Sequence, residues 1–199
     1  VKSGELIGKK LINELKKKTK KIVFLSNDNP FVSRDKNKWN LFLESGKYFD
    51  LIAFQDKSRI RLSKKFGITK TLLVLPPYDN KIHIKHKIPK ILKKKISNDV
   101  IFVGTWSIEK SIFLQKLIRL GLDVKIFGSR WYKDKSFENF KERISLGHLY
   151  NKDYTKIIQS AKIAICIFEK KNLDTITARS IEIPAIGTFL CAMRTKTME

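Results

Sequence analysis

A group of residues suited to binding an anion lies in the stretch DTITARSIEIPAIGTFL, which runs from Asp174 to Leu190. Asp174 and Glu182 are separated by seven residues, and Arg179 stands between them. If the stretch is helical, a turn of about 100° per residue puts Thr175, Arg179 and Glu182 on one polar stripe. The free amide groups at the helix start favour phosphate, so we expect a diphosphate there and a ribose further along. An ordinary surface ion pair between Arg179 and Glu182 is the alternative.

A second place for phosphate follows the apolar run Asp99–Gly104. Gly104 lets the backbone approach a ligand closely, and Thr105 precedes the start of an expected helix. A simple tight turn is the alternative reading of this glycine. Lys110 falls in the first turn of the helix, where the dipole disfavours a cation unless an anion is near. A bound diphosphate would supply that anion, although a solvated lysine explains the sequence equally well.

Short apolar runs alternate with helical patterns along the whole chain, as in doubly wound sheets of parallel strands. The expected strands are 21–26, 51–55, 71–75, 99–104, 123–127, 162–168 and 188–192. The expected helices are 3–18, 35–46, 58–66, 107–120, 136–143, 154–161 and 175–186. The pattern predicts an α/β protein with two Rossmann-like parallel-sheet domains.

A boundary is expected at about 77–97, where two prolines end a strand and a lysine-rich stretch with little periodicity follows. We therefore divide the chain into a first domain at 1–80, a basic linker at 81–97 and a second domain at 98–199. The sequence begins with Val1 rather than methionine and stops at Glu199, just past an expected strand. We expect it to be a piece of a longer protein, with both domains truncated.

The stretch from Asp174 to Leu190 resembles the C-terminal-domain signature of the CgeB-like (spore-maturation-protein-like) glycosyltransferases of the GT-B group. Asp174 stands where the wider group carries the first glutamate of its Glu, seven residues, Glu motif. Two further stretches add to the resemblance. One is DVIFVGTW at 99–106 with VKIFG at 124–128, and the other is Asp153 and Tyr154 before AKIAICIF at 161–168.

The resemblance implies two Rossmann-like domains in the GT-B plan, with 1–80 on the acceptor side and 98–199 on the donor side. It implies a metal-independent enzyme without a cofactor that transfers a sugar from a nucleotide-diphosphate sugar. The acceptor would be a glycan, a lipid-linked sugar or a protein. A non-catalytic relative that binds a nucleotide or a partner is the first alternative. The donor-binding residues would be Gly104, Thr105, Lys110, Arg130, Asp174, Thr177, Arg179 and Glu182.

The formal net charge of +23 suits nucleic acid, an anionic membrane surface or an anionic substrate. The basic residues are mostly lysines spread along the chain, and no nucleic-acid-binding motif is present. We therefore expect no nucleic-acid partner, and a basic nucleic-acid-associated protein is the second alternative. A peripheral contact with anionic lipid is compatible with the lysine clusters at 16–21 and 93–95.

The two cysteines, Cys166 and Cys191, lie inside apolar runs and are expected to be reduced core residues of a cytoplasmic protein. His83 and His86 have no cysteine or carboxylate at ligand spacing, so no metal site is expected around them. No apolar run approaches the roughly 18 residues that a transmembrane helix needs, and the N-terminus lacks a secretory pattern.

Overall fold

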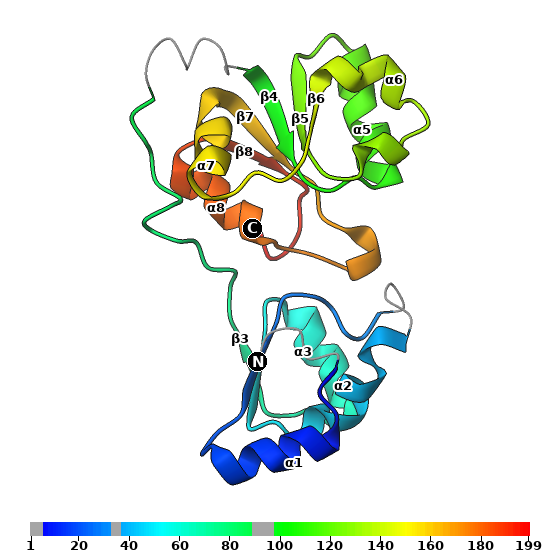
Figure 1. Ribbon diagram of the computed structural model, residues 1–199, viewed down its shortest axis with the longest axis vertical. Coiled ribbons are helices and arrows are strands. Elements are labelled where there is room, and N and C mark those ends of the chain that lie inside the picture. Colours follow the sequence, from blue (N-terminus) through cyan, green and yellow to red (C-terminus); the bar gives the residue numbers. More distant parts are fainter. Residues whose placement is uncertain (1–5, 33–36, 89–97) are drawn as a thin grey trace. The chain divides into compact units, whose positions relative to one another are not determined.

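The computed structural model describes residues 6–32, 37–88 and 98–199, which fall into two compact units (Figure 1). Unit 1 comprises Val1–Pro76, Phe168–Thr177 and Arg194–Glu199, and unit 2 comprises Pro77–Ile167 and Ala178–Met193. The division expected from the sequence differs from these units in three places. Two segments of the expected second domain belong to unit 1, 77–80 of the expected first domain belong to unit 2, and 81–88 of the expected linker also belong to unit 2. The rest of that linker, 89–97, lies outside the described residues.

Unit 1 contains a sheet of three parallel strands in the order β1-β2-β3. The elements follow the alternation expected from the apolar runs. They are α1 (Lys9–Lys18), β1 (Val23–Ser26), α2 (Asn40–Ser45), β2 (Leu51–Phe54), α3 (Lys57–Ser63) and β3 (Thr71–Leu73), with 3-10 turns at Gly46–Tyr48, Lys64–Phe66 and Lys170–Asn172. The first part of the expected helix 3–18 and residues 35–36 of the helix 35–46 lie outside the described residues.

Aromatic side chains dominate the core of unit 1. Phe24 of β1 and Phe42 of α2 are fully buried, with ring centroids 4.8 Å apart, and Ile12 faces this core from α1. The lysines of α1 that fall in its last turn, Lys16 to Lys18, lie near the negative end of the helix dipole. One side of α1 therefore packs against the core of unit 1, and the C-terminal end of the helix carries positive charge.

Unit 2 contains a sheet of five parallel strands in the order β6-β5-β4-β7-β8. The strands are β4 (Asn98–Val103), β5 (Val124–Gly128), β6 (Ile144–Leu146), β7 (Ala161–Cys166) and β8 (Phe189–Ala192). The helices are α5 (Ile108–Arg119), α6 (Phe137–Phe140), α7 (Asn151–Ser160) and α8 (Ala178–Ile186), with 3-10 turns at Trp131–Lys133 and Lys141–Arg143. Strand β6 was not predicted, because its three residues at the sheet edge carry no continuous apolar run.

The strand order of unit 2 reverses between β4 and β7. From β4 the chain moves outward through β5 to β6, then returns to the other side of β4 to form β7 and β8. Because parallel crossovers are right-handed, the reversal puts α5 and α8 on opposite faces of the sheet. Leu114 of α5 packs with Val100 and Phe102 of β4, and Ile183 of α8 is buried beside β7. Figure 1 shows α7 and α8 together, apart from α5 and α6.

The segment before residue 89 is fastened to α7. The backbone N–H of His86 donates to Oε1 of Gln159 at 2.8 Å, and Nε2 of Gln159 donates to the His86 carbonyl at 2.7 Å. The Thr155 hydroxyl donates to the Ile82 carbonyl at 2.9 Å. These bonds explain why 81–88 belongs to unit 2 although its sequence lacks periodicity.

The cysteines differ in their surroundings. Cys166 at the end of β7 is buried, as expected, but Cys191 is exposed. The expectation for Cys191 was wrong because β8 is an edge strand and one of its faces is uncovered. Within the described parts of the chain, every helix falls short of the length and apolarity needed to cross a membrane.

A close backbone approach in unit 2 requires glycine at position 128. Gly128 has a φ of +152°, and a Cβ built there would lie 2.0 Å from the Gly104 carbonyl oxygen. Gly147 has a φ of +115° and no atom within 4 Å of its Cβ position. We expect Gly128→Ala to lower the free energy of unfolding by about 3 kcal/mol or more, because a clash adds to backbone strain. Gly147→Ala suffers the strain alone and should cost roughly 1–2 kcal/mol.

Urea unfolding followed by tryptophan fluorescence measures the free energy of unfolding of both variants. Similar losses of stability in the two would contradict the close approach of the loops that end β4 and β5.

Candidate functional site

The loops that follow β4 and β5 are joined at the carboxyl end of the sheet. The N–H of Gly104 donates to the Phe127 carbonyl at 2.8 Å, and the N–H of Trp106 donates to the Ser129 carbonyl at 3.0 Å. The Trp131 ring Nε1 donates to the Gly104 carbonyl at 2.9 Å. Ligands of doubly wound sheets bind beyond this end of the strands. Gly104 is therefore held at the edge where the sequence placed it.

The structure brings four predicted site residues together here. Lys110 Nζ donates to the Thr105 carbonyl at 3.5 Å, so the ammonium group turns back toward the loop after Gly104. The Thr105 hydroxyl lies 3.3 Å from the Ser129 hydroxyl of the neighbouring loop. Arg130 follows directly, exposed and with a φ of +65°. We call Gly104, Thr105, Lys110, Ser129 and Arg130 the loop cluster.

The buried carboxylate of Asp134 holds the segment that follows Gly104 and Thr105 in place. Asp134 accepts from Trp106 Nε1 at 2.9 Å and from the Ser136 N–H at 2.8 Å. Burial raises the pKa of Asp134, but hydrogen bonds from Ser111 and Trp106 outweigh it, and the pKa lies below its ordinary value. The charged form is thus the stable acceptor, and it fixes Trp106 just before α5 begins.

A second group of polar side chains lies around the first turns of α8. The Tyr154 hydroxyl donates to Oε2 of Glu182 at 2.9 Å, and His83 Nε2 lies 3.8 Å from Oε1 of the same carboxylate. The Nε of Arg179 is buried and has no hydrogen-bond partner among the described residues. We call His83, Tyr154, Arg179 and Glu182 the α8 cluster.

The ionisation of Tyr154 reflects these neighbours. Burial raises the pKa of Tyr154, the Glu182 carboxylate raises it further, and Arg179 acts in the opposite direction. The net effect is a strongly raised pKa, so the phenol stays a hydrogen-bond donor. In the described part of the chain Arg179 forms no ion pair within 4.0 Å, and Glu182 is engaged with Tyr154. The surface ion pair considered from the sequence is therefore not formed.

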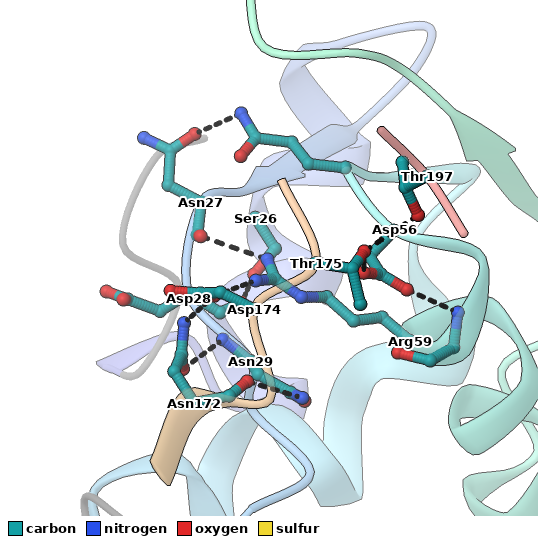
Figure 2. A network of polar contacts seen from close by, with 12 residues as sticks. Ser26, Asn27, Asp28, Asn29, Asp56, Arg59, Asn172, Asp174, Thr175 and Thr197 are labelled. Carbon is teal, nitrogen blue, oxygen red and sulfur yellow. Dashed lines mark hydrogen bonds and ion pairs between the residues drawn. The ribbon is translucent and has the colours of Figure 1, made fainter. Parts of the chain in front are cut away.

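Asp174 and Thr177 belong to unit 1, whereas the other predicted donor-binding residues belong to unit 2. The helix expected at 175–186 begins only at Ala178, so the polar stripe that was to include Thr175 does not exist. The physical reason is that unit 1 engages the residues before the helix. Asp174 Oδ1 accepts from Arg59 Nη2 at 2.8 Å, and the Thr175 hydroxyl donates to Asp56 (Figure 2).

Arg59 is the centre of this network in unit 1. Its side chain is 2% exposed, and Nη1 donates to the Asn27 carbonyl at 2.9 Å while Nη2 binds Asp174. Burial lowers the pKa of Arg59, and the nearby charge of Asp174 counteracts this. Asp174 is thus the counter-ion of a buried cation, which its position in the sequence motif did not indicate.

Two amide side chains complete the attachment of 168–177. The N–H of Asn29 donates to Asn172 Oδ1 at 3.1 Å, and Asn29 Nδ2 donates to the Asn172 carbonyl at 3.1 Å. Figure 2 shows these bonds beside the Arg59 guanidinium. Asp56 adds a further acceptor. Burial raises the pKa of Asp56, but hydrogen bonds from Thr175 and Ser58 bring it below its ordinary value.

Sequence reasoning missed several of these roles. Glu182 and His83 are far apart in the chain, and no local pattern signals that they meet. The sequence around Arg59 does not indicate that this arginine is buried, and it therefore gives no sign of the carboxylate partner that a buried arginine needs. Within the described residues, no three side chains among His, Cys, Asp and Glu gather in a way that would hold a metal ion.

Part of the chain matches a known protein family. Residues 109–199 match the protein family described as Glycosyl transferase-like. No curated protein matches the sequence.

Several solved structures share the fold. The structure described as trehalose-6-phosphate from E. coli bound with UDP-2-fluoro glucose has a TM-score of 0.55 at 14% identity, covering 88% of this chain and 53% of its own. HepE from Anabaena in complex with UDP and glucose has a TM-score of 0.61 at 11% identity, covering 84% and 52%. The UDP-forming trehalose-phosphate synthase from Burkholderia xenovorans has a TM-score of 0.51 at 11% identity, covering 89% and 53%.

The fold class predicted from the sequence is confirmed. The chain is an α/β protein with parallel sheets, like the GT-B glycosyltransferases to which these structures belong. It spans about half the length of each of them.

The buried pair of Arg59 and Asp174 gives a prediction about stability. Asp174→Asn leaves a buried cation without its counter-ion and should lower the free energy of unfolding of unit 1 by about 3–5 kcal/mol. Glu14→Gln is the matched control, because Glu14 and Lys17 form an ion pair of 2.8 Å in the same unit with side chains 53% and 70% exposed. That change should cost less than about 1 kcal/mol.

Chemical denaturation of both variants supplies the comparison. If Asp174→Asn proved as mild as Glu14→Gln, Asp174 would not be the counter-ion that the geometry describes.

Proposed function

We propose that the chain is part of a metal-independent glycosyltransferase that uses a nucleotide-diphosphate sugar as its donor. The observation that carries the proposal is the buried, unpartnered Nε of Arg179, one helical turn from Glu182 on α8. The family match at 109–199 includes both residues and supports the assignment.

A diphosphate would supply what Arg179 lacks. A buried guanidinium N–H without a partner is costly, and a phosphate oxygen satisfies it with a strong, charge-assisted hydrogen bond. Arg179 is the second residue of α8, where the free amide groups and the helix dipole also favour an anion. These groups, with Lys110 of the loop cluster, are proposed to offset the diphosphate charge.

Glu182 is suited to the uncharged part of the ligand. Its Oε2 accepts from Tyr154, and its Oε1 has no hydrogen bond within the described residues. A carboxylate repels phosphate but accepts hydrogen bonds from hydroxyl groups, so we assign Oε1 to the ribose of the nucleotide. In this arrangement Arg179 binds the diphosphate near the helix start, and Glu182 binds the ribose.

The proposed reaction needs charge stabilisation at the leaving group. A bond forms between the anomeric carbon and an acceptor oxygen, the bond to the diphosphate breaks, and the acceptor hydroxyl loses its proton. Negative charge develops on the diphosphate as it leaves, and fixed donors aimed at it lower the barrier. Arg179 and the first amides of α8 would act in this way.

The nature of the donor follows from the same proposal. HepE from Anabaena holds UDP and glucose, and a further similar structure holds UDP-2-fluoro glucose. We propose a donor of the same chemical class for this chain and use UDP as the probe. We also propose that the protein belongs to the CgeB-like family, on the residues between Asp174 and Leu190, and that it is cytoplasmic, on its two free cysteines.

Calorimetric titration of the full-length protein with UDP tests the proposal. Arg179→Lys keeps the charge but loses the planar fork, so affinity should fall about tenfold or more. Glu182→Gln should weaken binding about fivefold to thirtyfold through loss of a charged acceptor. Arg119→Lys is the control, because Arg119 is an exposed residue of α5 whose Nη2 donates to Gln115.

The proposal also predicts release of nucleoside diphosphate from a nucleotide sugar at a rate unchanged by EDTA. Tight binding of short DNA or RNA with no binding of UDP would favour the nucleic-acid alternative. Binding of UDP without any transfer in a panel of nucleotide sugars and acceptors would favour the non-catalytic relative.

A further inference from the structure

The Tyr154 hydroxyl and the Glu182 carboxylate are joined across two helices of unit 2. Tyr154 lies on α7 and donates to Oε2 of Glu182 on α8 at 2.9 Å. We propose that Tyr154 is a positioning residue, which turns the carboxylate so that Oε1 meets a vicinal diol of the ligand. The inference rests on the proposed function, because it takes Glu182 as the residue that recognises the ribose.

Tyr154 is itself held in place from several sides. Its side chain is buried, and Ile158, one turn further along α7, is buried as well. The carbonyl of Ile158 accepts from the Thr188 hydroxyl at 3.0 Å, and Thr155 is bonded to the Ile82 carbonyl. The phenol therefore belongs to a buried side chain on an anchored helix, and it offers Glu182 a donor at a defined position.

The protonation states around Glu182 favour one arrangement. The phenol is the donor to Oε2, so this oxygen of Glu182 already accepts a hydrogen bond within the protein. The N–H of Asp79 donates to His83 Nδ1 at 2.9 Å, so the proton of a neutral His83 is on Nε2, which faces Oε1. The distance of 3.8 Å exceeds that of a hydrogen bond, and Oε1 keeps its capacity to accept from a ligand.

A free glutamate side chain has three rotatable torsions, and ordering it on binding costs conformational entropy. The bond to Tyr154 removes this freedom before the ligand arrives. The lower entropy cost favours binding only of the ligand groups that contact Glu182. These groups are the ribose hydroxyls and not the diphosphate. Loss of the Tyr154 hydroxyl should therefore weaken recognition of the diol and leave recognition of phosphate intact.

The experiment compares two probes in calorimetric titrations of the full-length protein. UDP carries both ribose hydroxyls, and the diphosphate of 2′,3′-dideoxyuridine carries neither. Tyr154→Phe should weaken UDP binding about fivefold to twentyfold, the scale of the entropy cost of ordering one glutamate side chain on binding. Binding of the dideoxy probe should stay unchanged. Tyr150→Phe removes a hydroxyl from an exposed tyrosine at the start of α7 and should alter neither affinity.

A double-mutant cycle separates positioning from a general structural role. In the Glu182→Gln background, Tyr154→Phe should cause little further loss of UDP affinity, because Tyr154 acts through the carboxylate. An equal loss for both probes, or losses that simply add in the double variant, would overturn the inference.

Two other results have distinct meanings. If Glu182→Gln weakens UDP binding and Tyr154→Phe does not, the positioning role is wrong while the proposed function stands. If the wild-type protein binds no nucleoside diphosphate, the proposed function fails and the positioning role fails with it.

Discussion

The reversal of strand order between β4 and β7 is the constraint on which the arrangement of unit 2 depends. Helices that leave neighbouring parallel strands in opposite directions must cover opposite faces, yet both begin at the carboxyl edge of the sheet. The starts of α5 and α8 therefore come to this edge with free amide groups and positive dipole ends. The loop cluster lies at the start of α5, and the α8 cluster lies at the start of α8.

Each unit contains an arginine with a buried Nε, and the two arginines differ in their partners. In unit 1 the Arg59 guanidinium finds its counter-ion in Asp174, so that charge is satisfied within the protein. The Nε of both Arg59 and Arg179 is buried without a hydrogen-bond partner among the described residues, and the neighbouring Glu182 in unit 2 accepts from the Tyr154 phenol. The difference is that Arg59 has a carboxylate counter-ion and Arg179 has none within the described residues, and this is why we propose the diphosphate at α8 rather than beside Asp174.

The sequence predicted the alternation of elements and the class of fold because continuous apolar runs report buried parallel strands directly. It missed β6, whose three residues at an edge lack such a run, and it extended the last helix back to 175. Side-chain bonds to unit 1 decide that helix start, and helical periodicity carries no information about them. Lys110 lies in the first turn of its helix as predicted, whereas the partners of Glu182, which are Tyr154 and His83, come from distant segments that only the fold brings close.

The central claim is that the carboxyl edge of unit 2 binds a nucleoside diphosphate, and hydrogen–deuterium exchange of the full-length protein with and without UDP tests it most directly. The first amides of a helix have no partner inside the helix and exchange fast unless a ligand accepts from them. We predict that UDP slows exchange in peptides covering 104–110 and 178–182. Unchanged exchange at both places, with protection appearing only in the lysine-rich α1 or nowhere, would contradict the account.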